Sequence, residues 1–267
     1  MASIFSIKNL VFSYENTSMF NDFNLEIEEG KFISIIASNQ AGKTTLTKLL
    51  CAIIPTNDKF ILDGISLNKG NVLNYLTKIG LVFNDTNFFL TKRVRDELAY
   101  PLLNLNMKDH KINQRIDEIT DFFDISNLLG KKIIDLTYSE KKKLLIIISL
   151  IHNPKFLVLD DAFLGMNEKD KIFMLTKLKE LNNKGLTILN ITSQLDTIYE
   201  SDMVYVLNNY QLEKEGSPIE ILEQDSYLNK LGLTIPFIVE TSLKLKFYNL
   251  IDKIYFDIKS LEEDLWK

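Results

Sequence analysis

Residues 37–45 read Ala37-Ser38-Asn39-Gln40-Ala41-Gly42-Lys43-Thr44-Thr45. An apolar, β-branched run at 32–36 precedes them, and a helix-like stretch at 46–54 follows. A buried strand, a tight loop and a helix N-terminus together form a phosphate-binding loop, because the N–H groups of the loop and the positive end of the helix attract anions. The pattern predicts that Lys43 reaches the β- and γ-phosphates of a nucleotide and that the Thr44 hydroxyl binds Mg²⁺. The alternative, a chance Gly-Lys-Thr at the start of a helix, is disfavoured by both flanks.

The loop opens with Ala37, where the usual pattern has glycine. An alanine held at a positive φ costs roughly 1 kcal/mol, so we expect some strain at this position. The residues that we expect to contact the nucleotide are Ser38, Asn39, Gln40, Ala41, Gly42, Lys43, Thr44 and Thr45.

The composition is that of an ordinary globular protein, with 46% hydrophobic and 25% charged residues. The net charge of −5 argues against nucleic-acid binding, which needs a positive surface. The single cysteine, Cys51, lies in an apolar stretch, so we expect a core residue and a reducing cytoplasmic setting. The longest apolar run, 144–151, is far shorter than the ~20 residues that span a bilayer, and we expect no signal peptide. Any membrane role must therefore come through a partner.

Hydrophobic periodicity predicts strands and helices in a definite order. We expect strands at 3–14, 23–27, 32–36, 59–62, 79–83, 156–159, 187–191 and 203–207. We expect helices at 46–54, 94–105, 112–123, 139–152 and 167–182. This order predicts an α/β P-loop NTPase core with an antiparallel β edge, interrupted by a helical subdomain at about 88–152. The core would span residues 1–225, and a C-terminal helical extension would span 226–267.

An acidic turn, Asp160-Asp161, follows the expected strand at 156–159. In phosphoryl transfer the first carboxylate helps to hold Mg²⁺ through its water shell, and the next residue can orient the attacking water. Such a turn is common by itself, but downstream of a phosphate-binding loop it is a strong indication. We therefore predict Asp160 as a metal ligand together with Thr44, and Asp161 as a catalytic residue.

The order of these motifs resembles that of the ATP-binding cassette ATPases over nearly the whole chain. Residues 136–140, Leu-Thr-Tyr-Ser-Glu, align with the family signature Leu-Ser-Gly-Gly-Gln, and a basic tail of three lysines follows. Residues 164–167 lie at the D-loop, and 191–193 lie at the loop that carries the switch histidine of the family. The resemblance implies that ATP is the nucleotide, that Tyr14 stacks on adenine, and that Asn84 is the Q-loop residue at the metal and the attacking water.

The C-terminal part of the chain resembles a more specific group within this family. The stretch at 228–240 looks like the C-terminal extension of energy-coupling-factor transporter ATPases. Apolar residues then recur at helical spacing: Phe247, Leu250, Ile254, Ile258, Leu261 and Leu265. Such a helix either packs on its own domain or contacts a second subunit, and the spacing favours neither. The resemblance implies a second ATPase subunit, a transmembrane coupling protein and a substrate-binding membrane protein, which import a vitamin or metal ion from the cytoplasmic face of the membrane.

Several positions depart from the family pattern. Gln40 replaces a loop glycine and adds bulk where the backbone approaches phosphate, and Asn84 is one methylene shorter than the Q-loop glutamine. In the signature, Thr137 keeps the hydroxyl of the family's serine, whereas Tyr138 and Ser139 replace both glycines. The amides of those glycines approach the γ-phosphate held by the partner subunit. We therefore expect weaker contacts from Thr137 and Ser139 to that nucleotide.

The positions closest to the chemistry are altered as well. Asp161 replaces the catalytic glutamate of the family, and a displacement of ~1 Å at such a position can cost on the order of 100-fold in rate. Ser193 replaces the switch histidine, and Asn167 replaces the D-loop aspartate, which removes a charge from the dimer interface. The only histidines, His110 and His152, lie in expected helical segments and not in that loop.

Because Lys43, Thr44 and Asp160 are retained, the pattern suits nucleotide binding better than fast hydrolysis. One interpretation is a slow transport ATPase of the energy-coupling-factor type, with Asp161 as the base. The other is a structural or regulatory subunit that binds nucleotide without hydrolysing it and pairs with a better-equipped ATPase. The altered positions favour a heterodimer over a homodimer. The acidic balance and the tail disfavour a soluble cassette protein that acts on nucleic acid.

Overall fold

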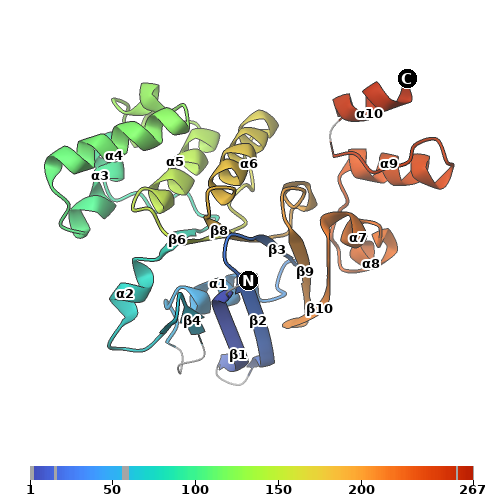
Figure 1. Cartoon of the computed structure of the whole chain (residues 1–267), viewed down its shortest axis with the longest axis horizontal. Coiled ribbons are helices and arrows are strands. Elements are labelled where there is room, and N and C mark those ends of the chain that lie inside the picture. Colours follow the sequence, from blue (N-terminus) through green and yellow to red (C-terminus); the bar gives the residue numbers. More distant parts are fainter. Residues whose placement is uncertain (1–2, 15–16, 56–59, 257, 267) are drawn as a thin grey trace.

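Two β-sheets form the centre of the structure, a computed structural model that describes residues 3–14, 17–55, 60–256 and 258–266 (Figure 1). The smaller sheet is antiparallel and has the order β2 (Thr17–Glu28), β1 (Ser3–Tyr14), β4 (Phe60–Leu62) and β5 (Ile65–Ser66). The larger sheet has the order β10 (Gln211–Gly216), β9 (Met203–Asn208), β3 (Phe32–Ile36), β8 (Thr187–Thr192), β7 (Phe156–Asp160) and β6 (Ile79–Val82). All of its strands are parallel except β10. The predicted α/β core with an antiparallel edge is confirmed.

The burial of the strands explains why the sequence reveals them. Every residue of β3, β7 and β8 is buried, because the parallel sheet is covered on both faces, and these strands read as continuous apolar runs. Towards its end, β2 alternates between buried and exposed residues because one of its faces is solvated. Strand β10 was not predicted, since its sequence Gln-Leu-Glu-Lys-Glu-Gly is mostly exposed and charged. Lys59, the first residue of the strand expected at 59–62, lies outside the described residues.

The helix after the phosphate loop, α1 (Lys43–Leu50), begins and ends earlier than the stretch predicted at 46–54. It begins inside the Gly-Lys-Thr motif, and it ends before Ala52, which has a φ of 56°. A left-handed residue ends a helix because it turns the chain away from the helical path. Cys51, beside that residue, is buried, and burial raises the pKa of its thiol. The expectation of a core cysteine is confirmed.

A helical layer covers one end of the larger sheet. It contains α3 (Val94–Asn104), α4 (Asp109–Phe122) and α5 (Tyr138–Leu150), together with the short 3₁₀ turns at Ser126–Leu128 and Ile133–Asp135. Between β6 and β7 the described residues form no further named strand, as predicted for the helical subdomain. Buried residues of all three helices join those of β7 and of α6 (Glu168–Asn182) in one apolar core. A short helix, α2 (Val72–Leu76), precedes β6.

A short helix, α7 (Pro218–Leu222), ends the core, and the described residues of the C-terminal extension form α8 (Asp225–Lys230), α9 (Phe237–Phe247) and α10 (Ile258–Leu265). The continuous helical repeat predicted from Phe247 to Leu265 is wrong, because α9 ends at Phe247. Asn249 has a φ of 56°, and the N–H of Leu250 donates to the carbonyl of Leu245 at 3.0 Å, which is how a left-handed residue closes a helix.

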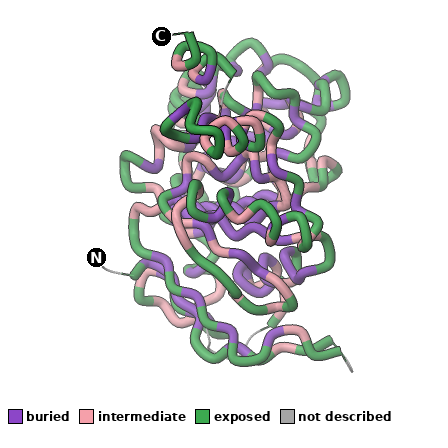
Figure 2. The backbone as a smooth tube through the Cα atoms, turned by 90° about the vertical axis from the view of Figure 1, so that its right-hand side faces the viewer, coloured by how far each residue is buried: buried purple, intermediate pink, exposed green. Residues whose placement is uncertain are grey.

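Part of the extension packs on its own domain. Leu228, Val239 and Ile254 join Val204 and Val206 of β9 in one buried cluster. Other apolar side chains of the extension remain exposed: Phe237, Phe247, Tyr248, Leu250, Ile258, Leu265 and Trp266. Figure 2 shows buried backbone through the centre of the molecule and exposed backbone at its periphery, including the C-terminal end.

Candidate nucleotide-binding site

Most of the predicted site residues follow four neighbouring strands of the larger sheet. The phosphate loop follows β3, Asn84 follows β6, Asp160 ends β7 and Ser193 follows β8. These strands are parallel neighbours in the order β3-β8-β7-β6, so their carboxyl ends lie at the same edge of the sheet. In open α/β sheets, ligands bind outside that edge.

The phosphate loop curls around the side chain of Lys43. Its ammonium donates to the carbonyls of Ala37 at 3.0 Å and Ser38 at 2.9 Å. Ala37 does not have a positive φ, so the strain expected there is absent. Its N–H donates to the carbonyl of Thr192 at 3.0 Å, which keeps it in line with the strand. The strained residue is instead Gln40, with a φ of 68°. The loop therefore carries its conformational cost at Gln40.

Gly42 is required by its surroundings. It has a φ of 101°, and a Cβ added to it would lie 2.7 Å from Cδ1 of Tyr210 in the turn of the β9–β10 hairpin. Phe20 of β2 packs against Tyr210 at 5.8 Å between ring centroids. The hairpin and the antiparallel sheet thus form a wall beside the loop. At the end of β1, Tyr14 is 44% exposed, which leaves a ring surface open for a base.

Thr44 and Asp160 form the expected metal side of the site. The Asp160 carboxylate is buried, and the nearby Thr44 hydroxyl lowers its pKa against the effect of burial. Burial, followed by the neighbouring charge of Asp161, raises the pKa of Asp160 to about 6. A buried carboxylate with a raised pKa, beside a hydroxyl oxygen, suits Mg²⁺, which takes one or two protein ligands and completes its shell with phosphates and water. No group of three or more His, Cys, Asp or Glu that could hold a metal occurs among the described residues.

The raised pKa of Asp160 predicts a stability effect in the nucleotide-free chain. The folded state holds this proton more tightly than the unfolded state, so stability falls as the pH rises from about 4 to 6 and stays reduced at pH 7. Asp160→Asn removes the buried charge and is expected to raise the free energy of unfolding at pH 7 by about 1–3 kcal/mol. Urea denaturation in EDTA, at pH 4.5 and pH 7, measures the change.

Asp63→Asn is the matched control, because hydrogen bonds from Lys78 and then Lys155 hold the pKa of Asp63 below its usual range. That substitution must lower stability at pH 7. A loss of stability in Asp160→Asn as well would show that the Asp160 carboxylate is stabilised, not penalised, in the free chain.

The structure brings Asp161 and Ser193 into contact. Oδ1 of Asp161 accepts from the N–H of Ser193 at 2.8 Å, from its hydroxyl at 3.2 Å, and from the Thr192 hydroxyl at 3.2 Å. Its other oxygen, Oδ2, lies 3.8 Å from the Lys43 ammonium. The carboxylate thus ties the loop after β8 to the end of β7, and one of its oxygens is fully engaged by that loop.

Asn84 accepts hydrogen bonds from Lys142, for which the sequence predicted no role. The ammonium of Lys142 in α5 donates to the carbonyl of Asn84 at 2.7 Å and to its side-chain Oδ1 at 2.6 Å. Burial lowers the pKa of Lys142 to about 8, against the attraction of Asp161, Asp85 and Asp160. A run of three lysines reads as a solvated surface. The helical periodicity of α5 could have indicated that Lys142 is buried. Its side chain lies on the same buried face as Ser139, Ile146 and Ser149.

The signature residues are not placed at the phosphate loop of their own chain. Thr137 caps α5: its hydroxyl accepts from the N–H of Glu140 at 3.2 Å, and the Glu140 carboxylate accepts from the N–H of Thr137 at 2.8 Å. The Ser139 hydroxyl donates to Asp170 at 2.6 Å, and the Asn167 amide donates to Ser139 at 3.1 Å. The signature and the D-loop are therefore joined to each other within one chain.

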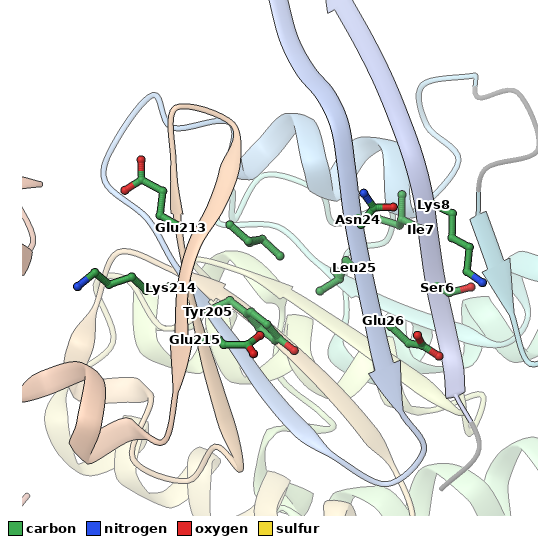
Figure 3. Close-up of a pocket in the computed structure, with 11 residues that line it drawn as sticks. Ser6, Ile7, Lys8, Asn24, Leu25, Glu26, Tyr205, Glu213, Lys214 and Glu215 are labelled. Carbon is green, nitrogen blue, oxygen red and sulfur yellow. The ribbon is translucent and has the colours of Figure 1, made fainter.

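A cavity between the two sheets is separate from these residues. It has a volume of about 550 Å³ and lies between the β1–β2 pair and the β9–β10 hairpin. Figure 3 shows Tyr205 and Glu215 on the side of the hairpin and Leu25 and Glu26 on the side of β2. None of the predicted site residues lines it. The candidate nucleotide site is therefore the loop cluster at the sheet edge.

Comparison with known proteins decides the family. The sequence profile described as ABC transporter matches residues 20–164. This chain belongs to the ABC transporter family of ATPases. The cassette is 30% identical over 268 residues to the energy-coupling factor transporter ATP-binding protein EcfA1 of Streptococcus thermophilus, which covers 98% of this chain and 97% of the relative. It is 27% identical over 274 residues to the protein of the same name from Streptococcus agalactiae, which covers 100% and 98%.

Solved structures share the fold of the cassette. The cbiO1 protein of Clostridium perfringens, described as part of the ABC transporter complex cbiONQ, has a TM-score of 0.77 at 23% identity and covers 88% of this chain and 97% of its own. A dimeric ATP-binding cassette in a post-hydrolysis state with ADP and Pi has a TM-score of 0.72 at 21% identity and covers 80% and 98%. In the described part of the cassette, no helix has both the length and the apolarity that crossing a membrane takes.

Proposed function

We propose that this cassette is the ATP-binding subunit of an energy-coupling-factor type importer, and that it binds MgATP tightly and hydrolyses it slowly. The proposal rests on one contrast within the site. The retention of Lys43, Thr44 and Asp160 at the phosphate loop and the end of β7 supports binding, whereas the hydrogen bonds of Asp161 with Ser193, and of Ser139 with Asp170, support slow turnover.

Binding would use the loop and the two residues at its base. Lys43 is already held inside the curl of the loop, where a charged N–H donor contacts phosphate oxygens at low entropic cost. Thr44 and Asp160 would hold Mg²⁺, whose charge neutralises that of the phosphates when it is bound. Tyr14 would stack on the base, since part of its ring is exposed.

Turnover would be slow because the side chain of Asp161 is one methylene shorter than that of glutamate and its Oδ1 already accepts hydrogen bonds. A general base must lie within hydrogen-bond reach of the proton that it takes. Oδ1 of Asp161 accepts three hydrogen bonds from the last residue of β8 and the first residue of the loop after it, so water must displace at least one of them. Ser193 offers only a short hydroxyl where the family has a long histidine side chain. Asp161 and Ser193 would therefore act mainly by positioning.

The partners would be a second ATPase subunit, a transmembrane coupling protein and a substrate-binding membrane protein, at the cytoplasmic face of the membrane. The relatives named EcfA1 support this assembly. Exposed apolar side chains also support it, since Phe88 and Leu90 after Asn84, and Phe247 and Trp266 in the extension, are each at least 60% exposed. The altered signature, which would complete the partner's site, favours a heterodimer. The membrane partner would select the vitamin or metal ion.

The alternative is a structural or regulatory subunit that holds nucleotide without hydrolysing it. The Ser139–Asp170 and Ser139–Asn167 contacts favour it, because they engage the signature within its own chain. Single-turnover hydrolysis of radiolabelled ATP, with MgATP binding measured on the same sample, separates the two. Slow product formation supports the importer ATPase. Tight binding without product supports the alternative, and absence of binding overturns both.

A further inference from the structure

Lys142 is a buried cation whose charge needs an explanation. Its side chain is 0% exposed, yet both of its hydrogen bonds go to the oxygens of one neutral residue, Asn84. Burying an ammonium is unfavourable when only neutral oxygens accept its hydrogen bonds, because these oxygens do not neutralise the charge that has been removed from water. A glutamine would fill the same position and donate to the same oxygens at a lower cost. The charge itself must therefore have a role.

The surroundings of Lys142 indicate that role. Asp160, Asp161 and Asp85 are the carboxylates whose charge acts on it, and two of them belong to the metal and catalytic positions of the site. The next lysine along the helix, Lys143, is paired instead with Asp170 at 2.7 Å, away from Asn84. Lys142 alone of this pair places a positive charge between α5, the Q-loop and the acidic end of β7.

We infer that Lys142 is a positioning residue that fixes the Q-loop and holds Asn84 Oδ1 in place of Mg²⁺. This inference rests on the proposed function, since it concerns the same MgATP site. The amide oxygen is the atom that could ligate a metal, and it already lies 2.6 Å from an ammonium. Two cations on one oxygen would repel each other, so Thr44 and Asp160, without Asn84, would be the protein groups that hold Mg²⁺.

The test measures Mg²⁺ dependence and Q-loop order in the full chain. Fluorescence of mant-ATP, titrated with MgCl₂, gives the Mg²⁺ concentration at half-saturation for wild type, Asn84→Ala, Lys142→Gln and the double variant. Hydrogen exchange of the amides at 83–88 in the nucleotide-free chain gives the order of the Q-loop. Lys142→Gln keeps a hydrogen-bond donor without the charge, and Lys141→Gln, one residue earlier on the same helix, is the control.

We expect Asn84→Ala alone to leave the half-saturating Mg²⁺ concentration within twofold of wild type. Lys142→Gln is expected to lower that concentration at least fivefold and to speed exchange at 83–88 at least fivefold. Adding Asn84→Ala to Lys142→Gln is expected to cancel the gain in Mg²⁺ affinity, because Oδ1 is then lost to the metal. Lys141→Gln is expected to change neither quantity.

Two results would overturn the inference. In the first, Asn84→Ala weakens Mg²⁺ binding equally in the wild-type and Lys142→Gln backgrounds, which makes Asn84 a metal ligand independent of Lys142. In the second, Lys142→Gln changes thermal stability alone, which makes the role purely structural. If wild type binds no mant-ATP, the proposed function fails by itself. Hydrogen exchange at 83–88 then tests separately whether Lys142 fixes the Q-loop. Unchanged exchange in Lys142→Gln would overturn that part of the inference.

Discussion

Lys43→Ala is expected to weaken MgATP binding by at least 100-fold. The Lys43 ammonium is the positive side chain held inside the phosphate loop by the carbonyls of Ala37 and Ser38. Losing charge-assisted hydrogen bonds to phosphate costs about 3 kcal/mol, which corresponds to about 100-fold in affinity. Isothermal titration calorimetry with MgATP measures the loss directly.

Lys48→Ala is the matched control for this change. Lys48 lies in the last turn of the same helix, α1, and is only partly buried. It is expected to leave MgATP affinity within twofold, and thermal melting of both variants checks that the loop still folds. An unchanged affinity in folded Lys43→Ala would remove the phosphate loop from the nucleotide site.

The larger sheet could be predicted from the sequence because its strands are buried on both faces. Strands β3, β7 and β8 read as uninterrupted apolar runs, and the structure places each within one residue of the expected bounds. Apolar runs did not predict β10, because its pairing with β9 depends on backbone hydrogen bonds and not on apolar side chains. Apolar spacing also predicted a helical repeat across Asn249, where a left-handed residue interrupts the helix.

The candidate site, like the fold, could be predicted from the sequence only in part. The sequence predicted Lys43, Asp160 and Ser193 after strands of the core, because strand ends follow from periodicity. It could not show where each side chain turns. The engagement of Asp161 with Ser193, and that of Asn84 with Lys142, are contacts between segments far apart in the chain. Such contacts depend on packing, which neither spacing nor composition encodes.

The double variant Asp161→Glu/Ser193→His is expected to raise the single-turnover rate of ATP hydrolysis at least tenfold. The extra methylene of Glu moves the carboxylate outward, and a misplacement of ~1 Å can account for about 100-fold in rate. Ser193→His removes the hydroxyl at 3.2 Å, one of the three donors to the carboxylate oxygen at position 161, which reduces the competition with water for that oxygen. MgATP affinity is expected to stay within threefold, since Lys43 and Thr44 are untouched.

The double variant is also expected to be less stable. Measuring its stability distinguishes an effect on catalysis from an effect on folding. Asp161 has a φ of 45°, a region where Asp is tolerated better than Glu, so the variant is expected to lose roughly 1 kcal/mol of folding stability. Asp161→Asn is the control: it keeps the backbone preference and is expected to abolish the remaining turnover without loss of binding. A faster rate in a less stable protein would identify the carboxylate position as the limit on hydrolysis. An unchanged rate would move that limit to the signature, where Tyr138 and Ser139 replace the two glycines.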